Sequence, residues 1–145
     1  VRPSDVSLEE FYEVKETIKF LEEAKAKKVA LQFPDAMLGD SHGVYDQLVL
    51  AMAQTEFFIL ADTSYGGCCV DEVAAAHVSA DAIVHYGDAC LSRTGGEITV
   101  RFVFGKHPLP DLPRLVDALL EKIPSITASP SRPDGKEVRG EGEGD

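Results

Sequence analysis

The chain has 145 residues, a formal net charge of −11 at pH 7 and 44% hydrophobic residues, which suits one domain with a substantial core. A chain this acidic would repel nucleic acids and acidic membrane surfaces, so we expect neither as a partner. No apolar run reaches the roughly 20 residues that span a bilayer, and we expect no secretory leader. Three cysteines without a secretory signal favour a reduced, cytoplasmic setting over a disulfide framework.

The first part of the chain predicts a helix, a strand and a second helix. Residues 7–28 carry apolar side chains at helical spacing, and Ser7 followed by Glu10 matches a capping box, so we expect one long helix there. The apolar run 29–33 predicts a short strand. A second helix is expected from about 41 to about 54, because its apolar residues again recur at helical spacing.

The second part predicts three further strands and two helices. The runs 56–62 and 81–87 are apolar almost throughout, which is typical of strands covered on both faces. A short helix is expected over 70–79. Residues 98–105 alternate in polarity, which predicts a strand with one wetter face at a sheet edge. A closing helix is expected over 111–122.

Alternation of strands and helices predicts an α/β fold, with a three-layer, mostly parallel, four-stranded sheet flanked by helices. We expect this domain to occupy residues 1–124. Residues 125–145 are rich in Gly, Pro, Ser and charge and cannot bury enough apolar surface to order themselves, so we expect a flexible linker or tail there.

The three cysteines of the chain follow two of the expected strands. Cys68 and Cys69 close the loop "TSYGGCC" after the second strand, and Cys90 follows the third. Loops at the carboxyl ends of parallel strands gather at one edge of the sheet, so we expect Cys68 and Cys90 to share that rim. The cysteine pair also precedes the helix expected over 70–79, whose dipole favours the thiolate form that binds iron or zinc.

Other interpretations of the cysteines are open at this point. Cysteine is often a small core residue. A disulfide between Cys68 and Cys69 is disfavoured, since neighbouring Cα atoms lie about 3.8 Å apart. A zinc site lacks both a C-x-x-C motif and an obvious fourth ligand, and His77 and His85 suit structural roles better. A thiol–disulfide enzyme also lacks C-x-x-C. Phosphate-loop, dinucleotide and hydrolase motifs are absent from the sequence.

The sequences of three segments resemble those of a known family. "VALQFPDAMLGDS", "FILADTSYGGCCVDEVAAAHVSADAIVHYGDACLS" and "VRFVFGK" fall within about residues 29–105. They resemble the diphthamide-biosynthesis family, the 2-(3-amino-3-carboxypropyl)histidine synthases. The resemblance implies a chain of three similar α/β domains, of which this sequence would be the first.

The resemblance also implies a cofactor and a substrate. In that family, cysteines from separate segments hold a [4Fe–4S] cluster, and one iron stays open for S-adenosylmethionine. Reductive cleavage gives a 3-amino-3-carboxypropyl radical that adds to a histidine of translation elongation factor 2. Carried onto this chain, Cys68 is the first cofactor-binding metal ligand and Cys90 the second. Cys69 ranks below both, as a residue that turns into the core or replaces a lost neighbour, and no residue is assigned a catalytic role.

Two short segments favour one kind of subunit. Residues 32–35 read QFPD and residues 87–90 read GDAC, whereas catalytic subunits read more like Q-x-P-E-G-L and G-H-S-C. The resemblance is therefore to the second subunit, which pairs with a homologous catalytic subunit and, with an electron-donor protein, aids reduction of that subunit's cluster. The isolated chain is expected to be inactive. The alternative is a non-catalytic docking module with structural cysteines.

Overall fold

The computed structural model of the chain describes residues 2–61, 67–106 and 111–127. Its contacts divide the chain into two units, residues 1–108 and 109–145. The first unit holds a four-stranded parallel sheet in the order β2-β1-β3-β4. The strands are β1 (Lys28–Gln32), β2 (Glu56–Leu60), β3 (Ala82–Tyr86) and β4 (Thr99–Val103). The helices of this unit are α1 (Leu8–Phe11), α2 (Val14–Glu23), the 3₁₀ turn η1 (Asp35–Met37), α3 (Leu38–Ala51) and α4 (Glu72–His77).

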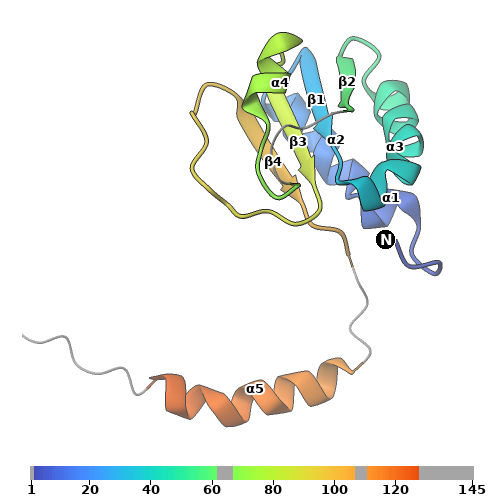
Figure 1. The fold of residues 1–145 in the computed structure, drawn as a ribbon. Helices are drawn as coiled ribbons and strands as arrows, with labels where there is room; N and C mark the ends of the chain where they lie inside the picture. Colours follow the sequence, from blue (N-terminus) through green and yellow to red (C-terminus); the bar gives the residue numbers. More distant parts are fainter. Residues whose placement is uncertain (1, 62–66, 107–110, 128–145) are drawn as a thin grey trace, which may run out of the picture. The chain divides into compact units, whose positions relative to one another are not determined.

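Helices cover both faces of the sheet, as the expected three-layer α/β fold requires (Figure 1). On one face, α1, α2 and α3 pack over alternate strand residues such as Val29 and Leu31, which are fully buried. On the other face, the short α4 packs over Ala30 and Ile83. Because the two central strands, β1 and β3, are covered on both sides, they read as continuous apolar runs rather than alternating ones.

The prediction of one continuous helix over 7–28 is wrong, because two helices, α1 and α2, lie there. Glu13 has a left-handed backbone, with φ of 49°, and separates α1 from α2. The carboxylate of Glu13 accepts a 2.9 Å hydrogen bond from Arg101 of β4, which stabilises this uncommon conformation. Apolar spacing continues across the break because both helices face the same core. The predicted cap is confirmed, since Ser7 accepts a hydrogen bond from the backbone N–H of Glu10.

The remaining elements agree with the expected ones to within a few residues. The strands expected over 29–33, 81–87 and 98–105 are β1, β3 and β4, and β4 lies at the sheet edge as predicted. The strand expected over 56–62 is β2, and residue 62 lies outside the described part. The helix α3 begins at Leu38, earlier than expected, because η1 leads directly into it.

The second unit contains α5 (Leu112–Thr127), which includes the closing helix expected over 111–122. Residues 128–145 of the expected tail lie outside the described residues. The division of the chain into a domain at 1–124 and a linker at 125–145 stays a prediction. Across the described ranges, none of the helices combines the length and apolarity needed to cross a bilayer.

Candidate metal centre

The three cysteine thiols meet at the carboxyl edge of the sheet. Their sulfurs all lie within 4.8 Å of one another. The Sγ atom of Cys69 lies 3.9 Å from that of Cys68 and 3.7 Å from that of Cys90. The expectation that Cys68 and Cys90 share one rim is therefore confirmed. Cys69, ranked below them from the sequence, lies in contact with both, and these three residues form the thiol triad.

Backbone hydrogen bonds place the two cysteine loops against each other. The N–H of Cys90 donates to the carbonyl oxygen of Cys68 at 3.0 Å. Asp71 caps α4 by accepting a hydrogen bond of 2.8 Å from the N–H of Ala74, and this fixes the chain just after the cysteine pair. The carboxylate of Glu72 accepts from the N–H of Gly95 at 2.9 and 3.0 Å, so α4 also holds the segment that follows Cys90. Residues 63–66 of the "TSYGGCC" loop lie outside the described residues.

The thiols differ in acidity. A hydrogen bond with the Ser92 hydroxyl, 3.2 Å from the sulfur, lowers the pKa of the Cys90 thiol to about 7. Hydrogen bonds with Cys90 and then Cys68, together with the negative charge those sulfurs carry as thiolates, raise the pKa of Cys69 to about 11. The expectation that the helix dipole favours a thiolate is wrong for Cys69, because nearby sulfurs outweigh a short helix that begins only at Glu72. Of these two thiols, Cys90 forms the anion at the lower pH.

The donor set suits a soft metal centre. Cys68 and Cys90 are exposed and Cys69 is half-buried, so the thiols are reachable from solvent rather than packed as core residues. Thiolates select zinc, Cu(I) and iron–sulfur clusters over hard cations. A single tetrahedral zinc with bonds of about 2.3 Å would hold its sulfurs about 3.8 Å apart, close to the two shorter separations here. Iron–sulfur clusters are held by the same thiolate ligands. Three thiolates leave one further coordination position for another ligand.

Two hollows adjoin the triad. A cavity of about 420 Å³ reaches Cys68 from the loops after β1, β2 and β3. Its lining residues are Pro34, Ala36, Met37, Gly67, Cys68, Gly87, Asp88 and Phe104. A smaller one, of about 70 Å³, adjoins all three thiols and the segment 91–94. A small molecule could therefore approach Cys68 from the larger cavity while a metal occupies the triad.

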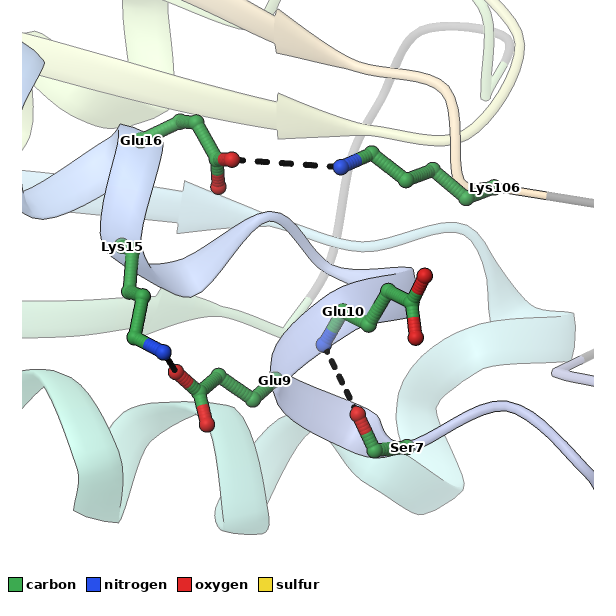
Figure 2. A pocket seen from close by; sticks show the side chains of 6 residues that line it. All are labelled: Ser7, Glu9, Glu10, Lys15, Glu16 and Lys106. Carbon is green, nitrogen blue, oxygen red and sulfur yellow. Dashed lines mark hydrogen bonds and ion pairs between the residues drawn. The ribbon is translucent and has the colours of Figure 1, made fainter.

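Another hollow, of about 330 Å³, has no cysteine in its lining (Figure 2). Four of its five charged side chains pair with each other, Lys15 with Glu9 at 2.7 Å and Lys106 with Glu16 at 3.8 Å, and Glu10 is the fifth. It shares no lining residue with the two hollows beside the thiols. Since both of its lysines are already paired with glutamates, we assign no chemistry to it.

Fold and site together define a parallel α/β domain with three clustered thiols, a candidate metal site, at the carboxyl ends of its strands. The chain belongs to the diphthamide synthesis protein family, whose model matches residues 33–131. This confirms the family resemblance found in the loop segments.

Individual relatives agree with this assignment. The chain is 47% identical over 116 residues to the 2-(3-amino-3-carboxypropyl)histidine synthase subunit 2 of Gallus gallus, covering 80% of this chain and 24% of that one. It is 51% identical over 102 residues to the protein of the same name from Schizosaccharomyces pombe, covering 70% of this chain and 20% of that one. The chain thus spans about a fifth to a quarter of the length of these curated relatives.

Solved structures support the fold. The crystal structure of Dph2 from Pyrococcus horikoshii matches with a TM-score of 0.58 and 24% identity, covering 79% of this chain and 32% of that one. A second crystal structure of that protein, described as containing a 4Fe-4S cluster, matches with a TM-score of 0.57. At this identity the likeness shows the α/β fold, and the family comes from the sequence comparisons.

Proposed function

We propose that this chain is the cluster-bearing first domain of subunit 2 of a 2-(3-amino-3-carboxypropyl)histidine synthase, acting in the first step of diphthamide biosynthesis. The observation that carries the proposal is the thiol triad, whose three sulfurs lie within 4.8 Å of one another at the edge of the sheet. The chain that bears this triad is a member of the diphthamide synthesis protein family. The names of the relatives give the pathway and the subunit. The domain would occupy residues 1–124 and be the first of three similar ones.

The proposed cofactor is a [4Fe–4S] cluster held through Cys68 and Cys90. The exposed thiols, their soft donor chemistry and the cluster named for the Pyrococcus horikoshii protein support this choice. Cys69 lies within 3.9 Å of both proposed ligands and is the reserve or third ligand. When bound, the cluster supplies an electron for the cleavage of S-adenosylmethionine by the complex.

The side chains of this domain would prepare the site for metal. Cys90, with a pKa of about 7, is the thiol most ready to bind at neutral pH, and the Ser92 hydroxyl stabilises its anion. Cys69, with a pKa of about 11, would release its proton to solvent only as metal binds. The cavity beside Cys68 would admit a small molecule or a partner's side chain to that flank of the triad.

The proposed setting is a cytoplasmic heterodimer. The sequences of residues 32–35 and 87–90 favour the role of a second subunit that helps to reduce the cluster of a homologous catalytic partner. That complex would modify a histidine of translation elongation factor 2 and would accept electrons from a donor protein. The chain alone would then be inactive, since it spans only part of its relatives.

Anaerobic reconstitution with ferrous iron and sulfide tests the proposal. Full-length subunit 2 should become brown and bind iron and sulfide in equal amounts, and the double variant Cys68→Ser/Cys90→Ser should lose most of both. A Thr55→Val variant serves as the control, since Thr55 hydrogen-bonds the backbone of Ala26 away from the thiols and its loss removes no ligand. Undiminished iron in the double variant would refute the two ligands. If the protein instead held one zinc per chain and no sulfide, a mononuclear zinc site would take the place of the cluster in the proposal.

A further inference from the structure

Two buried polar side chains lie side by side at the carboxyl ends of the central strands. Gln32 of β1 is the register partner of His85 of β3. Gln32 is 1% exposed and His85 is 0% exposed, among strand residues that are otherwise apolar. A buried polar group destabilises a fold unless it is hydrogen-bonded, so the partners of these two side chains indicate what they do there.

The amide of Gln32 holds the loop that carries Cys68 and Cys69. Its Nε2 donates to the carbonyl oxygen of Cys69 at 2.8 Å, and its Oε1 accepts from the backbone N–H of Asp71 at 3.0 Å. Both ends of the amide are therefore used on residues that flank Val70. Since one partner is the backbone of Cys69 itself, a shift of the amide would shift the central sulfur of the triad.

The ring of His85 holds the other cysteine loop. Its Nε2 lies 3.0 Å from the carbonyl oxygen of Asp88, so in the tautomer with a proton on Nε2 this nitrogen donates to the carbonyl. Its Nδ1 is buried without a hydrogen-bond partner among the described residues. Asp88 lies two residues before Cys90, whose N–H donates to Cys68. The imidazole therefore fixes the start of the segment that places Cys90.

We propose that Gln32 and His85 are positioning residues of the thiol triad: the amide sets Cys69 and the imidazole sets Cys90, so that the sulfurs stay at metal-binding separation. The inference rests on the proposed function, in which the triad holds a metal. Neither side chain would touch the metal or transfer a proton to or from it. Partners that orient metal ligands in this way typically contribute about 10- to 100-fold to metal affinity.

Titration of the reduced, metal-free chain with Cd²⁺, followed by thiolate-to-metal absorption, tests the proposal without a cluster. Gln32→Met keeps the side-chain length and removes both hydrogen bonds, and it should weaken Cd²⁺ binding about tenfold or more. Gln32→Glu keeps the acceptor for Asp71 and removes the donor to Cys69, and it should weaken binding as well. Thr55→Val is the matched control, because Thr55 also donates to a backbone carbonyl, that of Ala26, before β2 at the opposite edge of the sheet.

Several outcomes separate this inference from the proposed function. Cd²⁺ affinity equal to that of the unsubstituted chain in folded Gln32→Met and His85→Phe variants would overturn it, as would unfolding of both Gln32 variants, which would show a purely structural role. Strong Cd²⁺ binding that depends on Gln32, without iron–sulfur reconstitution, would support positioning and reject the cluster. In reconstituted full-length protein, a shifted cluster potential in Gln32→Met but not in Thr55→Val would support both.

Discussion

The backbone N–H of Cys90 donates a 3.0 Å hydrogen bond to the carbonyl oxygen of Cys68, and it joins the loops after β2 and β3 directly at the thiol site. Each loop is thereby tied to the other as well as to the sheet. Because the bond lies on the main chain of two of the three cysteines, a displacement of either loop moves both sulfurs. Substitutions that shift one loop should therefore change the reactivity of the whole triad.

Gly87→Ala should test this coupling. Gly87 begins the loop to Cys90 with φ of +88°, and an added Cβ would lie 2.8 Å from Cγ of Pro34, in a rigid ring. Gly96 has φ of +82° but open space around it, so Gly96→Ala shares only the backbone strain. That strain costs about 1 kcal/mol. Gly87→Ala should lose at least about 1 kcal/mol more in the free energy of urea unfolding, through overpacking.

Gly87→Ala should also weaken Cd²⁺ binding, whereas Gly96→Ala should not. Equal unfolding free energies and equal Cd²⁺ affinities in the two variants would show that the contact with Pro34 does not set the position of the Cys90 loop.

The shared edge of Cys68 and Cys90 could be predicted because it depends on a general rule. Parallel strands all end at the same edge of a sheet, so two cysteines that follow two such strands share that edge, even though β1 lies between β2 and β3 here. The contact of Cys69 with both could not be predicted, since a loop has no periodicity that gives the direction of a side chain. The sheet itself was predictable because its strands are apolar, buried segments.

Two other features depend on contacts between residues far apart in the sequence. The break at Glu13 is stabilised by Arg101, a partner 88 positions away, while local helix signals continue across it. The role of Gln32 depends on backbone groups 37 and 39 positions away. One local signal was available for Gln32: it is the polar residue within the otherwise apolar run 29–33, where an unpaired amide would be costly.

Cys90 should react with iodoacetamide at a lower pH than Cys69. With its pKa lowered to about 7, Cys90 should show a reaction midpoint near pH 7, because only the thiolate attacks. Cys69, with its pKa raised to about 11, should stay unreactive until the pH approaches that value. Differential alkylation of the metal-free chain, read by peptide mass spectrometry, measures both midpoints.

Ser92→Ala provides the control for this order of reaction. Removing the hydroxyl should raise the Cys90 midpoint towards the ordinary cysteine value of about 8.5. An unchanged midpoint would mean that Ser92 does not stabilise the anion. A common midpoint for Cys90 and Cys69 would contradict the difference in acidity itself.

Asp81→Ala should destabilise the fold without affecting the thiols. At the amino-terminal edge of the sheet, the Asp81 carboxylate accepts hydrogen bonds from the backbone N–H groups of Lys27 and Lys28 at 3.0 to 3.3 Å. Because the carboxylate is exposed, we expect a loss of about 1 kcal/mol, or a fall in Tm of about 5 °C. The Cys90 alkylation midpoint should stay near pH 7. A thermal scan unchanged from that of the unsubstituted chain would show that water replaces these bonds at no cost.

Metal affinity should rise with pH, and Cys69 should contribute a defined part of the rise. Below its pKa of about 11 this thiol is protonated, so each metal that binds through its sulfur must displace a proton. Cys69 alone should then make Cd²⁺ affinity increase about tenfold per pH unit between about pH 7 and about pH 8.5. Below the Cys90 pKa of about 7, displacement of the Cys90 proton should make the increase steeper by about one further unit in the slope of log affinity against pH. In Cys69→Ser, the slope of log affinity against pH should fall by about one above pH 7, because no proton leaves that position. Isothermal titration calorimetry in buffers of different ionisation enthalpy would count the protons released on Cd²⁺ binding. An equal count in Cys69→Ser and in the unsubstituted chain would show that Cys69 does not bind the metal.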